Sequence, residues 1–262
     1  MNAPISRPPS SACQTCPAHN LGNLTKLGID MEAWDYVIAL AGNPNTGKST
    51  IFNALTGLRQ HTGNWPGKTV SRAEGGFSYA GKRYKIVDLP GTYSLLSTSL
   101  DEEVARDFIL FGQPDVTVIV VDATRLERNL NLALQVMEIT NRVVIALNLI
   151  DEARRHNITV DERRLARDLG VPVVPTAARS REGIPELIQA IHQVAAAEIV
   201  PQPRRLKNEP PALKKALNKL VPKIKAAFPG LPNARWVAIR LLDGDQRIAQ
   251  AVQRGELGEL GG

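Results

Sequence analysis

A glycine-rich segment early in the chain has the residues that a phosphate-binding loop requires. Residues 42–49 read GNPNTGKS, which fits the pattern G-x-x-x-x-G-K-[ST] between a predicted strand and a predicted helix. The glycines let backbone N–H groups converge on phosphate oxygens, and the positive end of the following helix favours the same anion. Lys48 is expected to reach the β- and γ-phosphates, and the Ser49 hydroxyl to bind Mg²⁺. The predicted nucleotide contacts in this segment are Gly42, Asn43, Pro44, Asn45, Thr46, Gly47, Lys48, Ser49 and Thr50.

A second motif, D-x-x-G, begins at Asp88, ends at Gly91 and also follows a predicted strand. The carboxylate is expected to hold Mg²⁺, usually through water, and the Gly91 amide to bind the γ-phosphate and respond to its loss. The loop between the two motifs must also supply a hydroxyl to Mg²⁺. Thr69 is the first candidate and Thr62 the second, and the alternative interpretation is a turn capped by threonine. The residues expected to act in catalysis are Lys48, Thr69, Gly91 and Asn45.

An N-x-x-D motif after the next buried run indicates guanine rather than adenine. The Asp151 carboxylate can accept both donors on the guanine edge, N1–H and the 2-amino group, whereas adenine offers no such pair. Asn148 is expected to brace this loop and the base. After the last predicted strand, the backbone amide of Ala178 is expected to meet the guanine carbonyl. The predicted base contacts are Asn148, Asp151, Thr176, Ala177 and Ala178.

The elements that must position these motifs alternate along the chain. Apolar, β-branched runs are typical of strands buried on both faces of a parallel sheet, and helical patterns separate them. This alternation predicts an α/β fold, a P-loop GTPase G domain with a mostly parallel, doubly wound sheet whose ligands bind beyond the carboxyl ends of the strands. The predicted strands are 36–41, a hairpin over 75–88, 116–122, 142–148 and 171–175, and the predicted helices are 48–56, 126–140, 161–169 and 184–197.

The two ends of the chain differ from this middle part. Residues 1–34 are rich in Pro, Ser and Asn and show little periodicity. Prolines at 201, 203, 210 and 211 indicate a linker, and helices are predicted after it over 212–227, 233–242 and 246–254. We therefore expect a flexible arm over 1–34, the G domain over 35–200, and a small all-α helical domain over 201–262 whose Gly-rich end gives no clear closing cap.

Composition and charge limit the compartment and the partners. The longest apolar runs are far shorter than the about 20 residues that a bilayer requires, and the first 34 residues lack the pattern of a secretory signal. We therefore expect a soluble intracellular piece. The net charge is +6, and ten basic residues against Glu209 alone lie between residues 203 and 240. Such a block suits nucleic acid, an anionic membrane surface or a solvated helix face.

The two cysteines, Cys13 and Cys16, lie close together near the N-terminus, and His19 follows three residues later. Two cysteines form no disulfide framework and suit a reducing compartment. Thiolates and an imidazole at this spacing could bind a metal ion, but a C-x-x-C without a second pair is a weak pattern. The alternative is two free cysteines in a tail.

The strings GNPNTGKS, GNWPGKTV, DLPGTYSL, DATRLERNL and NLID follow one another in this order. Over residues 36–245 they resemble the N-terminal G domain and helical spacer of the prokaryotic ferrous iron transport protein B, and NWPG and DATRLERNL are the most specific parts. The resemblance implies hydrolysis of GTP to GDP with Mg²⁺, on the cytoplasmic side of the inner membrane, in a protein that moves Fe²⁺. The partners it implies are a C-terminal membrane permease domain on the same polypeptide, small cytosolic proteins and further copies of the chain, with no nucleic acid.

The chain departs from the usual GTPase pattern at two places. Thr92 stands where many GTPases have a glutamine that orients water, so unaided hydrolysis should be slow. Asn45 resembles the position that helps to hold K⁺ in potassium-activated relatives. There, switch-loop carbonyls complete the shell, which the resemblance places near Gly63 and Trp65; a plain turn former is the alternative for Asn45. Leu149 replaces the usual lysine, which predicts weaker nucleotide binding and faster release of GDP.

Two other functions compete with this interpretation. A soluble GTPase of ribosome or tRNA biology would use the basic tail to bind RNA, although the tail has no interleaved aromatics and no recognisable RNA-binding module. A metal-sensing module would act through Cys13, Cys16 and His19, with the G domain as a scaffold. A salt-dependent RNA complex would favour the first, and stoichiometric binding of Zn²⁺ or Fe²⁺ the second.

Overall fold

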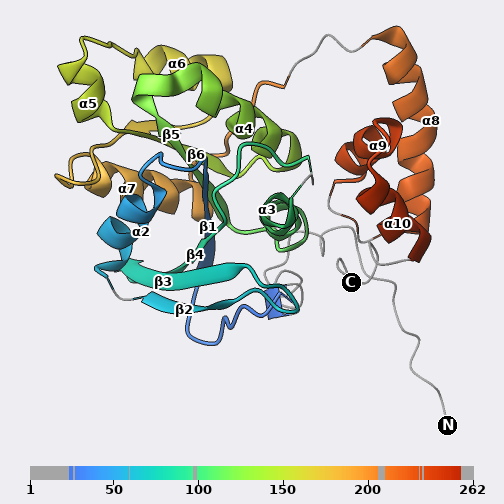
Figure 1. Ribbon diagram of the computed structural model, residues 1–262, viewed down its shortest axis with the longest axis horizontal. Helices are drawn as coiled ribbons and strands as arrows, with labels where there is room; N and C mark the ends of the chain where they lie inside the picture. The colour runs from blue at the N-terminus through green and yellow to red at the C-terminus, as the bar shows by residue number, and fades with distance from the viewer. Residues whose placement is uncertain are drawn as a thin grey trace.

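The computed structural model describes residues 24–25, 27–58, 60–96, 99–205, 210–229, 231 and 233–254. Its centre is a seven-stranded sheet made of β1 (Tyr36–Gly42), β2 (Gln60–Asn64), β3 (Ser71–Tyr79), β4 (Lys82–Asp88), β5 (Val116–Asp122), β6 (Val143–Asn148) and β7 (Val173–Pro175). The strand order is β2-β3-β4-β1-β5-β6-β7 (Figure 1). β3 runs antiparallel to β2 and β4, and the other neighbouring strands are parallel. The mostly parallel α/β sheet predicted from the sequence is therefore confirmed.

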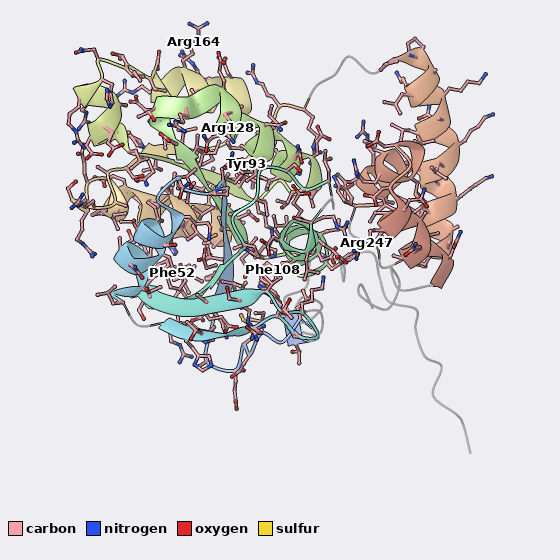
Figure 2. All side chains as sticks on the ribbon, viewed as in Figure 1. Phe52, Tyr93, Phe108, Arg128, Arg164 and Arg247 are labelled. Carbon is pink, nitrogen blue, oxygen red and sulfur yellow. The ribbon has the colours of Figure 1, made fainter. Side chains whose placement is uncertain are left out.

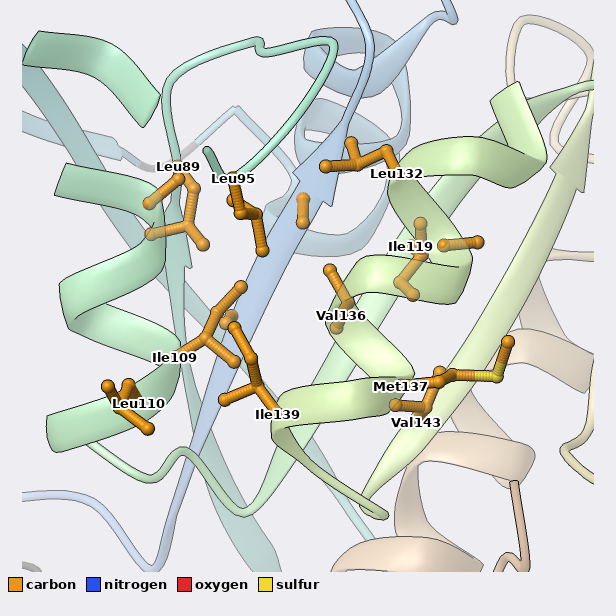
Figure 3. Close-up of a cluster of buried hydrophobic side chains, with 14 of the residues drawn as sticks. Leu89, Leu95, Ile109, Leu110, Ile119, Leu132, Val136, Met137, Ile139 and Val143 are labelled. Carbon is orange, nitrogen blue, oxygen red and sulfur yellow. The ribbon is translucent and has the colours of Figure 1, made fainter. Parts of the chain in front are cut away.

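Helices cover both faces of this sheet. The helices that connect the strands are α2 (Lys48–Thr56), α3 (Leu100–Phe111), α4 (Leu126–Ile139), α5 (Ile150–Arg155), α6 (Glu162–Leu169) and α7 (Ile184–Ala195). Alternate residues of β1 enter two cores, because successive side chains of a strand point to opposite faces. Val37 and Ala39 pack with α3 and α4, whereas Ile38 and Leu40 pack with α2 and α7. Figure 3 shows the side chains of α3 and α4 that fill the first of these cores.

The C-terminal part of the described chain is helical, as predicted, and packs beside α3 and α4. It consists of α8 (Pro211–Ala227), α9 (Ala234–Leu242) and α10 (Gln246–Arg254) (Figure 1). Arg247 of α10 pairs with Glu103 of α3 at 2.7 Å between Nη1 and Oε2. The side-chain amide of Asn233 donates to the carbonyls of Glu138 and Ile139 at the end of α4, over 2.9 and 3.0 Å. In the ranges that the structure describes, no helix combines the length and the apolar character needed to cross a bilayer.

The sequence patterns miss β2, α3 and the short helix α5. β2 reads QHTGN, which has no apolar alternation, so its strand conformation depends on pairing with β3. α3 did have a local signal: Ser99 and Glu102 form the S-x-x-E pattern of a capping box. In the structure the Ser99 hydroxyl accepts a hydrogen bond from the Glu102 amide over 3.2 Å.

The expectation of a flexible arm over 1–34 is wrong for its last part. Leu24 and Ile29 are only 3% and 1% exposed, and both belong to the core that α3 and α4 share with the sheet. Their apolar side chains, together with the half-buried Leu27, give this short segment enough contact to pack. Cys13, Cys16 and His19 lie outside the described residues.

Replacing Asn233 by alanine should lower the free energy of unfolding by about 1–2 kcal/mol. The Asn233 side chain caps α9 by accepting from the Trp236 amide over 3.0 Å and also satisfies two carbonyls of α4. Urea unfolding would measure the change. Asn218→Ala, at an exposed site on α8, is the matched control and should not destabilise the protein; an equal loss in both variants would contradict the prediction.

Candidate nucleotide-binding site

Two residues of the loop between β1 and α2 have a left-handed backbone conformation, which few residue types adopt. Gly47 has φ 81° where α2 begins, and a Cβ there would lie 2.3 Å from Nδ2 of Asn148. Asn45 has φ 66°, in the left-handed region that asparagine tolerates better than most residues. The Thr46 hydroxyl donates to the Asn43 carbonyl over 2.9 Å. The loop therefore leads directly into a helix N-terminus, which is a favourable place for an anion.

The buried side chain of Asn148 connects three loops. Asn148 ends β6 and is 1% exposed. Its Nδ2 donates to the carbonyl of Thr46 in the phosphate loop over 2.9 Å. Its Oδ1 accepts from the Thr176 hydroxyl and the Ala178 amide, each over 3.2 Å. The phosphate loop and the segment after β7 are thus held on either side of the loop that carries Asp151.

Asp88 ends β4 beside the phosphate loop. Its Oδ1 accepts a hydrogen bond from Nζ of Lys48, the first residue of α2. Burial raises the pKa of Asp88 above its ordinary value, although the Lys48 ammonium beside it lowers it. A carboxylate with so little solvent is stabilised by a neighbouring cation. The site therefore places one anionic and one cationic group in contact at the edge of the sheet.

The segment after Asp88 lies against the phosphate loop. The Thr92 amide donates to the Gly42 carbonyl over 3.3 Å, and Thr92 is 5% exposed. A Cβ on Gly91 would be 3.5 Å from Cα of Pro44, which is ordinary contact distance. The two motifs that the sequence assigned to phosphate and metal are therefore brought together.

The base side of the site differs in detail from the expectation. The Ala178 amide, which the sequence assigned to the guanine carbonyl, donates here to Asn148. The Asp151 carboxylate is 40% exposed and pairs with Arg155, one turn further along α5, over 3.1 Å. Leu149 has φ 64°, and its Cδ2 lies 4.0 Å from the place of a Cβ on Gly47. The Leu149 side chain therefore lies close to the phosphate loop.

The expected switch loop, residues 60–70, is folded as part of a hairpin. Gly63 pairs with Arg72 in the β2–β3 ladder. Beyond it, the Trp65 amide donates to the Val70 carbonyl and the Lys68 amide to the Trp65 carbonyl, each over 3.0 Å. Thr69 is exposed in this turn, and its hydroxyl makes no hydrogen bond with the described atoms of the phosphate loop. The candidate hydroxyl and the Gly63 and Trp65 carbonyls are therefore not gathered at the phosphate loop in this conformation.

Two contacts near the site involve residues to which the sequence assigned no role. The Arg128 guanidinium of α4 stacks over the ring of Tyr93, 4.5 Å from its centroid (Figure 2). The Gln135 side chain accepts from the Leu95 amide over 2.7 Å. Arg128 lies in the DATRLERNL string and Tyr93 in the DLPGTYSL string, but no spacing rule pairs positions so far apart. The segment that follows Gly91 is thus attached to α4.

Known families match both parts of the chain. Residues 36–191 match the family of ferrous iron transport protein B, and residues 210–260 match its cytosolic helical domain. An Fe(2+) transporter FeoB from Shigella flexneri is 43% identical over 215 residues, which are 79% of this chain and 27% of that protein. The chain thus spans about a quarter of the length of the curated relatives it matches.

Solved structures agree with this match. The cytosolic domain of the T. maritima FeoB iron transporter in a GDP form is 36% identical, with a TM-score of 0.75 and 85% of each chain covered. The FeoB G domain from Methanococcus jannaschii is 50% identical, with a TM-score of 0.55, and covers 62% of this chain and 97% of that one. The G-domain fold is therefore shared with both structures, and the helical domain after it with the cytosolic domain of the T. maritima relative.

Asn148→Ala should lower the free energy of unfolding by about 2–4 kcal/mol, because it leaves three buried groups in two loops without a partner. Urea unfolding without added nucleotide would measure it. Thr176→Val removes only one of these hydrogen bonds and serves as the graded control, with a smaller loss expected. If the two variants were equally stable, the connecting role of Asn148 would be refuted.

Proposed function

Because the chain belongs to the family of ferrous iron transport protein B, we propose that it is the GTP-binding and GTP-hydrolysing regulatory part of a membrane ferrous iron transporter. The observation that carries the proposal is the meeting of three motifs at one edge of the sheet. The phosphate loop contacts the Asp88 motif through Lys48 and the guanine motif through Asn148. GTP and GDP are the proposed ligands, as the GDP form of the T. maritima relative supports.

The phosphate end of the site has suitable groups for a nucleotide and Mg²⁺. Lys48 is the proposed contact to the β- and γ-phosphates. Ser49 at the start of α2, Asp88 and, from the switch loop, Thr69 are the proposed groups that hold Mg²⁺, which would neutralise charge on the phosphates. The contact between Lys48 and Asp88 supports this assignment, since it places both groups at one spot. The Gly91 amide, against the phosphate loop, is the proposed sensor of the γ-phosphate.

The base end of the site favours guanine. Asn148 fixes the loop that begins α5, and Asp151 lies at the start of that helix with its carboxylate partly exposed. A carboxylate there can accept from N1–H and the 2-amino group of guanine, in exchange for its surface pair with Arg155. Thr176, Ala177 and Ala178 are the proposed contacts on the other side of the base, where the Ala178 amide would be shared between Asn148 and the base.

Hydrolysis should be slow without a further positive charge. Thr92 is buried and cannot orient water as a glutamine does. A K⁺ ion held by Asn45, with the Gly63 and Trp65 carbonyls once the switch loop moves, would supply that charge in place of an arginine finger. The exposure of Asn45 in the phosphate loop supports this role, because an ion can reach its side chain, whereas its left-handed backbone suits a plain turn equally well.

The rest of the proposal concerns the longer protein. The relatives are about four times as long as the aligned part of this chain, so a membrane permease domain on the same polypeptide is the proposed partner. We place residues 35–200 as the G domain and 201–262 as the helical domain on the cytoplasmic side of the membrane. Small cytosolic proteins and further copies of the chain are additional proposed partners. Because the chain belongs to the transporter family, we prefer this function to the alternative of a soluble GTPase of ribosome or tRNA biology.

Asp151→Asn should weaken GTP binding by about 10²-fold or more and favour xanthosine nucleotides, whose 2-oxo group suits an amide donor. Competition between GTP, XTP and ATP for a fluorescent nucleotide would measure it. Arg155→Ala, which removes only the surface partner of Asp151, is the control and should keep the preference for guanine. Equal competition by ATP and GTP in the parent protein would refute the guanine assignment.

Hydrolysis should be faster in K⁺ than in Na⁺ at matched ionic strength, with saturating GTP and Mg²⁺. An arginine finger raises the rate of hydrolysis by about 10³-fold or more, and we expect the ratio of the rates in K⁺ and Na⁺ to be smaller than that. Asn45→Ala should abolish the difference between the salts, whereas Asn131→Ala, at an exposed site on α4, should keep it. Identical rates of phosphate release in both salts for the parent protein would exclude the cation.

A further inference from the structure

The chain has an N-terminal segment, described over residues 24–25 and 27–34, that packs before β1 begins. Its first part is a tight turn, in which the Gly28 amide donates to the Thr25 carbonyl over 2.9 Å and the Ile29 amide to the Leu24 carbonyl over 2.8 Å. The side chains of Leu24 and Ile29 are buried in the same core as Trp65 of the switch loop. Gly28 of the same segment lies beside Pro66, so the N-terminal segment contacts the switch loop as well as the sheet.

Trp65 is the residue of the switch loop that enters this core. It is 4% exposed, and its ring meets that of Phe108 on α3 edge to face, with 5.3 Å between centroids. Its indole Nε1 is buried and finds no hydrogen-bond partner among the described residues. A buried unpaired N–H opposes this placement of the ring. The contacts around Trp65 must therefore compensate for it if the loop is to stay in its hairpin.

Arg72 of β3 joins the N-terminal segment to the switch loop. Its guanidinium lies over the Trp65 ring, 5.3 Å from the centroid, and its Nη1 donates to the Leu27 carbonyl over 3.0 Å. Its Nε pairs with Glu74 over 2.8 Å. Glu74 also pairs with Lys85 over 2.6 Å, and Lys85 donates to the Asp30 carbonyl over 2.7 Å. The segment is thus attached to β3 and β4 at two carbonyls by charged, mostly buried donors.

Gly28 brings the segment into direct contact with the loop. A Cβ at this position would lie 2.8 Å from Cγ of Pro66, the residue after Trp65, and 3.0 Å from Nη1 of Arg72. Gly28 also has φ 76°, which side chains of L-residues rarely adopt. Position 28 therefore has no room for a side chain and has a backbone conformation that favours glycine. Both properties allow the segment to pack against the loop.

We infer that the N-terminal segment restrains the switch loop in its hairpin, and that Arg72 is the positioning residue that transmits this restraint to Trp65. The inference rests on the proposed GTPase function. Asn64 pairs with Ser71, and two residues further along β3 Ala73 pairs with Asp88, so the turn of residues 65–70 projects from the sheet at the end where Asp88 lies. For Thr69 to reach a metal ion at Ser49 and Asp88, this turn must open. Contacts that favour the hairpin lower the population of the competent conformation and slow turnover.

Loosening the segment should therefore raise kcat. Gly28→Val displaces the turn from Pro66, and Arg72→Lys keeps the charge but loses the planar group that stacks on Trp65 and reaches Leu27. Each should increase kcat for GTP by about three- to tenfold by population shift, with an unchanged Kd for GDP and a lower Tm. A merely structural role would lower Tm and kcat together.

The matched controls lie on the same elements. Glu32→Ala changes an exposed side chain of the segment, and Arg83→Lys changes an exposed arginine of β4; both should leave kcat and Tm as in the parent. Unchanged or reduced kcat in folded Gly28→Val and Arg72→Lys would overturn the inference.

A measurement without nucleotide separates this inference from the proposed function. In a Trp34→Phe, Trp236→Phe background of the full chain, Trp65 is the remaining tryptophan. Acrylamide quenching of its fluorescence should rise by about twofold or more in Gly28→Val and Arg72→Lys, because the ring leaves the core. Equal quenching in parent and variants would overturn the restraint even if GTP is hydrolysed. Absence of hydrolysis in the parent, with quenching increased in the variants, would refute the proposed function and leave the contact between segment and loop established.

Discussion

The buried amide of Asn148 is the interaction on which the geometry of the site depends. A parallel sheet brings the carboxyl ends of its strands to one edge, but it does not determine how the loops beyond them lie. Asn148 bonds to Thr46, 102 residues earlier, and to Thr176 and Ala178, 28 and 30 residues later. Away from water each of these groups needs its partner, so the loops are held to positions that satisfy the amide. Gly47 completes the arrangement, since any side chain there would occupy the place of that amide.

The sequence predicts those parts of the site that follow from short motifs or from the periodicity of neighbouring residues. The phosphate loop is readable from residues 42–49 because eight consecutive residues carry the spacing, and β1 and α2 on either side follow from their periodicity. The alternation of apolar strands and helices predicts the sheet for the same reason. The bracing role of Asn148 is also predictable, because an asparagine in that motif has few other uses. Its partner Thr46, by contrast, is known only once the loops are in contact.

Other features depend on contacts between distant residues and could not be read from a pattern. Lys48 and Asp88 were each assigned to a ligand, and their mutual contact follows only from β1 and β4 being neighbours. The Ala178 amide was assigned to the base because the sequence does not show that Asn148 competes for it. The N-terminal segment has too few apolar residues to produce a period, yet Leu24 and Ile29 find a core made by residues far along the chain. β2 likewise becomes a strand through its neighbour β3.

Under the proposed function, the contact between Lys48 and Asp88 would make the binding of the metal ion and the binding of the phosphate depend on each other. A phosphate that attracts the Lys48 ammonium leaves Asp88 as a carboxylate with little solvent, and a divalent cation then compensates for that charge. If the cation reaches Asp88 before the phosphate arrives, it displaces the Lys48 ammonium, whose charge is then stabilised by an anion. Each of the proposed ligands would therefore remove a cost that the other would otherwise bear, so the two would bind with positive cooperativity. The proposed metal–nucleotide complex would thus separate Lys48 from Asp88 more readily than either component alone.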